Sequence, residues 1–185
     1  MFKTPIVFFN YKRPETTTKV INELNKINYK KIYIVCDGWK NNEDKKKVIK
    51  VRNLIDKTIK KGSIKKLYFS QNIGIKNIIP KGLNWVFNFE KKVIILEDDT
   101  VPNKTFFYFC DQLLTRFEKN KKISMICGSN YNSDISKTMK ESYFFSKYSF
   151  IWGWATWKDR YISYDKHLNN WDKYKASNRL KNEFK

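Results

Sequence analysis

The sequence predicts an α/β fold with a largely parallel central sheet, and three observations support this prediction. Short apolar runs alternate along the chain with longer segments whose apolar residues recur at helical spacing. The clearest of these runs are apolar throughout, as in strands that are buried on both faces. Of the 185 residues, 41% are hydrophobic and 17% aromatic, which is enough for the core of one domain.

The first half of the chain contains three expected strands, at residues 5–9, 32–36 and 65–70. Pro14 suits the first turn of the helix after the first strand, because the N–H that proline lacks has no helical partner there. The two helices between these strands each keep apolar residues on one face. These residues are Val20, Leu24 and Ile27 in the first helix and Val48, Val51, Ile55 and Ile59 in the second.

The second half of the chain continues the alternation. A third helix begins near Ile75, and Pro80 is expected in or near its first turn, because proline breaks a helix interior. Residues 92–96 are the most strand-like run of the chain, and three acidic residues follow them directly. An amphipathic helix and a strand over residues 123–127 come next. The apolar residues of that helix are Phe106, Phe109, Cys110, Leu113 and Phe117.

The chain is strongly basic, since 38 Lys and Arg against 18 Asp and Glu give a net charge of +20. Lysine supplies most of this excess, which argues against recognition of base edges by arginine. Residues 40–66 carry eleven basic and three acidic residues. This charge indicates a solvated helix face; contact with an anionic membrane or a lipid-linked acceptor is the alternative.

The expected location is the cytoplasm. No run approaches the ~20 apolar residues of a membrane span, and the first ten residues lack the cleavage pattern of a signal peptide. Cys36, Cys110 and Cys127 are far apart and lie in apolar runs, so we expect reduced core thiols.

Glu97, Asp98 and Asp99 follow the fourth strand and form the most informative group in the chain. Like charges so close together repel each other, so a cation is expected beside them. Ligands of open α/β sheets bind outside the carboxyl ends of the strands, and carboxylates suit a Mg²⁺ or Mn²⁺ ion shared with substrate phosphates. The sequence favours such a metal; a solvated turn or a helix cap is the alternative.

Two further strand ends place polar residues at the same edge. Asp37-Gly38 closes the second strand, where a carboxylate can accept from a nucleobase N–H or a sugar hydroxyl; a turn is the alternative. Arg13 follows the first strand and precedes a helix, so that the guanidinium and the helix dipole could both face a diphosphate. A surface ion pair is the alternative for Arg13.

Five segments in order carry a resemblance to a known family. They are PIVFFNYKRP (5–14), VCDG (35–38), NIGI (72–75), IILEDD (94–99) and WGWATW (152–157). This set resembles bacterial GT-A glycosyltransferases, which are related to glycosyltransferase family 2 and more distantly to N-acetylglucosaminyltransferase I. The resemblance implies a GT-A, Rossmann-like nucleotide-diphospho-sugar transferase fold. It also implies a nucleotide-diphospho-sugar donor held by Mn²⁺ or Mg²⁺.

The resemblance assigns roles to the acidic group and to the strand ends. Asp99 resembles the metal ligand that bridges to the donor diphosphate, and Glu97 and Asp98 resemble the pair that contacts the ribose and the sugar. Asp37 resembles the residue that reads the base, which favours UDP. The residues that fall near the nucleotide and the diphosphate are Arg13 and Lys76.

Trp152, Trp154 and Trp157 crowd around Gly153. Indole faces stack on sugar rings, so this segment could form a platform for the donor sugar or the acceptor; a plug at the end of the sheet is the alternative. In the family, Gly153-Trp154 lies beside the donor sugar. Trp154 is therefore a predicted donor contact.

The resemblance also divides the chain into a nucleotide-sugar-binding domain, residues 1–150, and the start of an acceptor-side segment, residues 151–185. Related enzymes continue further and carry an acidic general base there, so the acceptor part is short or truncated here. Asp172 resembles the base-bearing segment by its spacing from Gly153-Trp154. Asp159 and Asp165 are lesser candidates.

The predicted function is that of an inverting, metal-dependent hexosyltransferase or N-acetylhexosaminyltransferase. It would transfer a sugar from a UDP-sugar to a glycan or lipid-linked acceptor in cell-surface glycan biosynthesis, with peripheral contact at the inner face of the membrane as a further possibility. One alternative is a catalytically incomplete fragment that binds nucleotide-sugars. The other alternative, which is less favoured, is a basic binder of nucleic acid or membrane surfaces. The favoured function involves no nucleic-acid partner. The donor sugar, the acceptor and the oligomeric state remain open.

Overall fold

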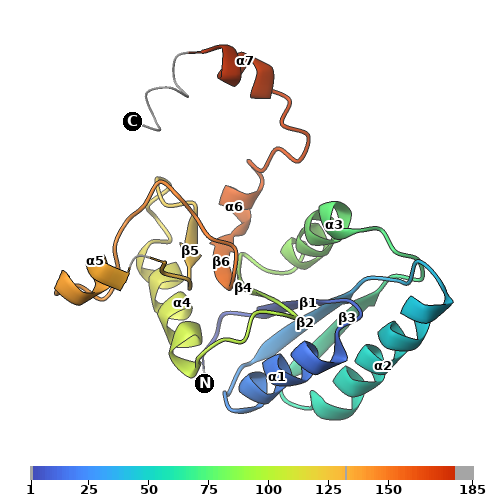
Figure 1. Ribbon diagram of the computed structural model, residues 1–185. Helices are drawn as coiled ribbons and strands as arrows, with labels where there is room; N and C mark the ends of the chain where they lie inside the picture. Colours follow the sequence, from blue (N-terminus) through green and yellow to red (C-terminus); the bar gives the residue numbers. More distant parts are fainter. Residues whose placement is uncertain (1, 132, 178–185) are drawn as a thin grey trace.

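The computed structural model describes residues 2–131 and 133–177, and these residues form one sheet of six strands in the order β3-β2-β1-β4-β6-β5 (Figure 1). Strands β1 to β4 run parallel to one another, whereas β6 is antiparallel to both of its neighbours. The predicted α/β class with a mostly parallel sheet is therefore confirmed. The strands are β1 (Ile6–Asn10), β2 (Lys31–Cys36), β3 (Ser63–Tyr68), β4 (Lys92–Glu97), β5 (Met125–Cys127) and β6 (Trp154–Trp157).

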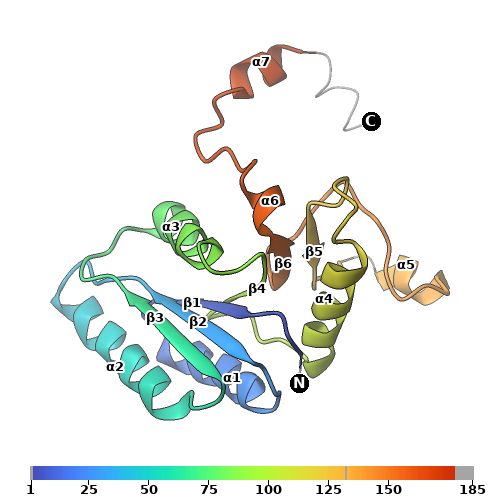
Figure 2. The same cartoon turned by 180° about the vertical axis from the view of Figure 1, so that it is seen from behind.

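Helices cover both faces of the sheet (Figures 1 and 2). Alternate residues of a strand point to opposite faces, so Ile6 and Phe8 pack into one core, and Val7 and Phe9 into the other. The first core includes buried residues from α1 (Pro14–Asn25), α2 (Asn42–Thr58) and α4 (Lys104–Arg116). The second core is built on α3 (Ile75–Phe87).

Some elements differ in detail from the sequence expectation. Strand β3 lies at Ser63–Tyr68, and β5 covers only Met125–Cys127. Pro80 lies one turn further inside α3 than expected, where it removes a backbone donor but leaves the helix continuous. In α4 the fully buried aromatic is Phe107, because the helix turns this face toward the sheet. The predicted core residues Phe106 and Phe109 are only half-buried.

Strand β6 lies between β4 and β5, so residues 154–157 share the sheet with the first 150 residues. The division at residue 150 stays a prediction, and residues 178–185 of the second segment lie outside the described residues. Beyond the sheet, α7 stands away from it in both views (Figures 1 and 2). The remaining helices are α5 (Ser133–Thr138), α6 (Lys158–Tyr161) and α7 (Trp171–Ala176).

The three cysteines are free, as predicted, with Cys36 and Cys110 buried and Cys127 half-buried. Burial raises the pKa of the Cys36 thiol to about 11, so this thiol stays protonated and unreactive near neutral pH. Among the described residues, no helix has both the length and the apolar character needed to span a bilayer.

Candidate functional site

The carboxyl ends of β1 and β4 lie side by side, because Phe9 pairs with Glu97 in the parallel register. The residues that follow each strand therefore meet. We call Glu97, Asp98 and Asp99 the acidic edge. Arg13, which follows β1, reaches this edge and binds two of its carboxylates.

The guanidinium of Arg13 bridges two neighbouring acids. Its Nη2 donates to Oδ1 of Asp98 at 2.5 Å, and its Nη1 donates to Oδ2 of Asp99 at 2.8 Å. The backbone N–H of Tyr11 also donates to Oδ2 of Asp98, at 3.0 Å. The side chain of Asp98 is 3% exposed, whereas that of Asp99 is 41% exposed. Arg13 therefore forms the ion pair that was its alternative role, and the metal that the sequence favours beside these acids stays a prediction.

Burial raises the pKa of Glu97, and the charges of Asp99 and Asp98 raise it further. Burial also raises the pKa of Asp98, although the Tyr11 N–H and the Arg13 charge oppose this shift. A raised carboxyl pKa means that folding disfavours the ionised form. An additional cation bound at the acidic edge would therefore stabilise the folded state.

A divalent metal fits this edge only if substrate phosphates supply some of its ligands. Among residues 2–131 and 133–177, no group of three or more His, Cys, Asp or Glu side chains is placed to hold a metal. A metal bound between one or two carboxylates and substrate phosphates needs no such group. Asp99 is suited to this role because its carboxylate is exposed and has an oxygen, Oδ1, to which no described residue donates.

Asp37 directly follows β2 and joins the loops after β2 and β3 through four hydrogen bonds, which we call the Asp37 tie. Its Oδ1 accepts from the backbone N–H groups of Gly38 and Ile73, at 2.8 and 2.9 Å. Its Oδ2 accepts from Nδ2 of Asn72 and from the N–H of Gly74, at 2.8 and 3.0 Å. A carboxylate has about four acceptor positions, so these four bonds fill it. The predicted contact of Asp37 with a base stays a prediction.

The Asp37 tie also positions the start of α3, whose N-cap is Gly74. Lys76 lies in the first turn of this helix and is exposed. Beside the tie, Trp39, Lys40, Gln71 and Asn72 line a small hollow of about 430 Å³. The loops after β2 and β3 therefore form a second open site at the same end of the sheet.

The two loops approach so closely that Gly38 has no room for a side chain. A Cβ at this position would lie 2.3 Å from the carbonyl carbon of Gln71. Gly38→Ala is therefore expected to lower the free energy of unfolding by about 1–3 kcal/mol, the usual cost of overpacking. Urea unfolding measures this, with the exposed Ser70→Ala as control. Equal unfolding midpoints for the two variants would contradict the expectation.

The tryptophans of the 152–157 segment have different environments. Trp154 is 8% exposed and packs into the α3 core, and Trp157 is 2% exposed and donates from Nε1 to the Leu114 carbonyl at 3.0 Å. This burial favours the plug for these two residues, and a donor contact by Trp154 stays a prediction. Trp152, in contrast, is 63% exposed.

The turn that presents Trp152 is held in place by two hydrogen bonds. The Trp152 carbonyl accepts from Oγ of Ser129 at 2.7 Å, and the Gly153 carbonyl accepts from the Gly128 N–H at 2.8 Å. Gly153 has a φ of +71°, which favours glycine. A Cβ there would lie 3.3 Å from Cγ2 of Thr100, so this turn borders the acidic edge.

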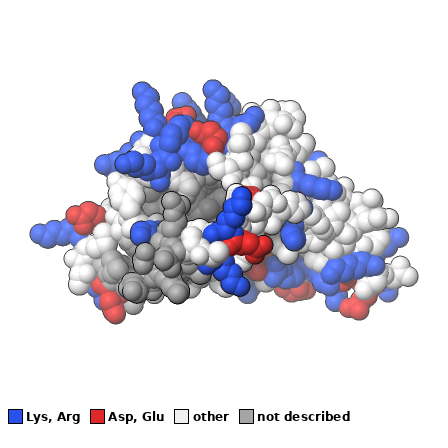
Figure 3. Space-filling model, turned by 90° about the horizontal axis from the view of Figure 1, so that it is seen from above, with Lys and Arg blue, Asp and Glu red and all other residues white. Residues whose placement is uncertain are grey.

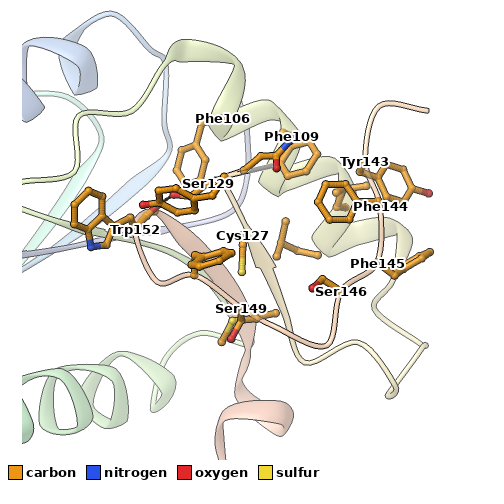
Figure 4. A pocket seen from close by; sticks show the side chains of 18 of the residues that line it. Phe106, Phe109, Cys127, Ser129, Tyr143, Phe144, Phe145, Ser146, Ser149 and Trp152 are labelled. Carbon is orange, nitrogen blue, oxygen red and sulfur yellow. Dashed lines mark hydrogen bonds between the residues drawn. The ribbon is translucent and has the colours of Figure 1, made fainter. Parts of the chain in front are cut away.

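A cavity of about 1340 Å³ extends from Asp99 between α4 and the segment that leads to Gly153. Most of its large side chains are aromatic, and hydroxyl groups such as those of Ser129, Ser146 and Ser149 lie among them (Figure 4). We call this the aromatic cavity. Its labelled aromatic residues in Figure 4 are Phe106, Phe109, Tyr143, Phe144, Phe145 and Trp152.

Within the described chain, the contacts of the three candidate general bases involve other parts of the molecule and not the acidic edge. Asp172 is exposed on α7, the helix that stands away from the sheet (Figure 1). Asp159 pairs with Lys121 and Arg160, and the Lys121 hydrogen bond in particular holds its pKa below the ordinary value. Asp165 accepts from the backbone N–H groups of a local turn.

Sequence reasoning missed residues that act through the backbone or through distant loops. Tyr11 binds Asp98 with its N–H, which no side-chain pattern reveals. Asn72 binds Asp37 across 35 positions of sequence. Asp44 fastens the loop before α1, because it accepts from the Tyr11 hydroxyl at 2.8 Å and from Lys12 at 2.6 Å. The Asn72-Ile73-Gly74 turn sequence before α3 is the one local signal that could have indicated the Asn72 contact.

No family model matches the sequence, and no curated protein matches it significantly. Solved structures do match the fold. A mannosyltransferase from Pyrobaculum calidifontis, solved with GDP-Man and Mn²⁺, is 8% identical with a TM-score of 0.55, covering 84% of this chain and 44% of its own. A 4-diphosphocytidyl-2C-methyl-D-erythritol synthase from Anaerococcus prevotii is 14% identical with a TM-score of 0.51, covering 95% and 76%.

This chain thus spans less than half of the mannosyltransferase. Both similarities cover most of this chain, at identities that speak for the fold alone. They agree with the fold predicted from the ordered motifs of the sequence. The chain therefore has a GT-A-like α/β fold.

Proposed function

We propose that this chain binds a nucleotide-diphospho-sugar at the carboxyl end of its sheet and acts as a glycosyltransferase. The observation that carries the proposal is the meeting of Arg13 with the exposed Asp99 at the border of the aromatic cavity. A guanidinium binds diphosphate oxygens, and a carboxylate beside it can share a divalent metal with the same diphosphate. The similarity to a mannosyltransferase solved with GDP-Man and Mn²⁺ supports this assignment.

In the proposed complex, the donor lies along the strand ends. The base, which we propose to be uracil, occupies the small hollow beside Asp37. The diphosphate lies near Arg13, with Lys76 also approaching it, and the sugar points toward Glu97 and the Gly153 turn. Asp99 would hold Mn²⁺ or Mg²⁺, which supplies positive charge to the departing diphosphate. Arg13 donates hydrogen bonds to the same oxygens and stabilises them as charge develops.

The proposed acceptor site is the aromatic cavity. Aromatic faces bind the apolar C–H surfaces of sugars, and hydroxyls beside them can pair with sugar hydroxyls. This chemistry supports a glycan or lipid-linked acceptor, whose attacking hydroxyl enters at the Asp99 end. An inverting displacement needs a carboxylate to accept the hydroxyl proton. We propose Asp172 for this role, which requires α7 to fold toward the edge.

A shift in melting temperature with nucleotides tests donor binding. A ligand at 100 times its Kd stabilises by about 2.7 kcal/mol, which for a chain of this size raises the Tm by about 5–10 °C. We expect this shift for UDP with Mn²⁺ and a smaller one for GDP or CDP. A larger shift with GDP would redirect the base assignment, and no shift with any nucleotide would contradict the proposal.

A second candidate function is donor binding without transfer. It is favoured by the position of α7, which carries Asp172 and stands away from the sheet. Incubation with UDP-sugars and Mn²⁺ separates the two functions, because a transferase usually releases UDP slowly by transfer to water. Binding without any UDP release would favour the second candidate.

The nucleic-acid alternative finds less support. On the face in Figure 3, Lys and Arg side chains are spread widely, with Asp and Glu among them, and they do not gather in one stripe. Nucleic-acid binding through phosphates weakens steeply with salt. Binding of UDP at a partly enclosed edge is less sensitive to salt, so a titration at two salt concentrations distinguishes these functions. Peripheral membrane contact through the lysines of α2 stays a proposal, testable by flotation with anionic vesicles.

A further inference from the structure

Arg13 divides its two hydrogen bonds between acids of very different exposure. The Asp98 carboxylate is 3% exposed, and the Tyr11 N–H holds it from the other side. The Asp99 carboxylate is 41% exposed and receives only the Nη1 bond from described residues. Arg13 is therefore anchored at Asp98 and bound loosely at Asp99.

The two contacts differ in how easily they break. An exposed ion pair contributes about 0–1 kcal/mol, whereas removing a partner from a buried pair costs about 3–5 kcal/mol. The Arg13 side chain is itself 51% exposed, so its outer nitrogen can move into solvent. Nη1 can thus leave Asp99 while Nη2 stays on Asp98.

From this asymmetry we propose that Arg13 is an internal counter-ion that keeps a divalent metal from Asp99 until a diphosphate arrives. Without nucleotide, a metal at Asp99 faces a positive guanidinium within hydrogen-bond distance of the same carboxylate. A bound diphosphate offers Nη1 a new anionic partner and offers the metal further oxygens. Nucleotide and metal then bind cooperatively, and metal alone binds weakly. This inference rests on the proposed donor site.

The test uses substitutions that separate the two contacts of Arg13. Arg13→Lys keeps the charge but has one ammonium, which satisfies the buried Asp98 and leaves Asp99 open. Arg13→Gln removes the charge. Lys19→Gln is the matched control, because it also removes one positive charge, from an exposed position on α1 that has no role in the proposed site.

Free Mn²⁺, measured by its electron paramagnetic resonance signal, reports metal binding without any turnover. Both Arg13 variants are expected to bind Mn²⁺ about tenfold more tightly than wild type when UDP is absent, a typical size for coupling between sites. Coupling is reciprocal, so the factor by which UDP tightens Mn²⁺ binding should shrink equally. Lys19→Gln is expected to match wild type in both measurements.

The possible failures can be told apart. If wild type binds Mn²⁺ with UDP, but neither Arg13 variant binds Mn²⁺ alone more tightly, the counter-ion role is overturned and the donor site stands. If wild type binds Mn²⁺ equally with and without UDP, the role is also overturned. If UDP does not bind at all, the donor site itself fails. Arg13→Lys keeps the test usable where Arg13→Gln does not fold, because lysine can still neutralise Asp98.

Discussion

Asp99→Asn is expected to abolish the effect of Mn²⁺ on UDP binding, lowering the metal-dependent affinity by at least about a hundredfold. The neutral amide oxygen of asparagine is a weaker metal ligand than a carboxylate, so the proposed link between protein and diphosphate is lost. The fold is expected to survive, because substitution of an exposed side chain changes stability by about 0.5 kcal/mol or less. Calorimetric titration of UDP with and without Mn²⁺ measures the effect.

Asp56→Asn is the control for this experiment, since Asp56 is similarly exposed but lies on α2 and pairs with Lys66. UDP binding without metal is expected to stay the same or to strengthen in Asp99→Asn, because Arg13 loses a competing partner. An unchanged metal-dependent affinity would contradict the assignment of Asp99.

Asp37→Ala is expected to lower the free energy of unfolding by about 3–5 kcal/mol, because each buried donor left without a partner costs about 1–3 kcal/mol. Four donors from the loops after β2 and β3 lose their acceptor together. Asp37→Asn should also destabilise strongly, because its NH₂ group would face the donors of Asn72 and Gly74. Urea unfolding of both variants gives the measurement.

The same variants distinguish the two roles considered for Asp37. A tie predicts that stability falls for alanine and asparagine alike. A base-reading residue predicts that Asp37→Asn keeps its stability and loses preference for UDP. Asn72→Ala, which removes a single bond of the tie, is expected to cost about 1 kcal/mol, a typical hydrogen-bond contribution.

Five of the six strands, all except β6, could be predicted from the sequence, because a strand buried on both faces leaves a clear apolar run. Residues 92–96 therefore predicted β4 and, with it, the position of the acidic edge. Contacts of single atoms could not be read in this way. The sequence placed Arg13 near a diphosphate, with a surface ion pair as the alternative, and in the structure it pairs with Asp98 and Asp99.

The tryptophan segment, residues 152–157, shows a second reason why the sequence did not predict every contact of the candidate site. The count of indoles indicated an unusual environment but not which face each residue occupies. That choice follows from β6 entering the sheet, which buries Trp154 and Trp157 on opposite sides and leaves Trp152 outside. The pairing of β6 depends on β4, which is about sixty positions earlier. No local pattern could indicate it.

The place of β6 has a consequence for biosynthesis. When β4 and β5 have left the ribosome, the strand that joins them has yet to be made, since Lys92–Glu97 pairs with Trp154–Trp157. During this interval, the hydrophobic β4 offers unpaired N–H and C=O groups to any other nascent strand. Premature termination near residue 150 should thus yield an aggregating product, and chaperone demand should peak just before the last strand emerges.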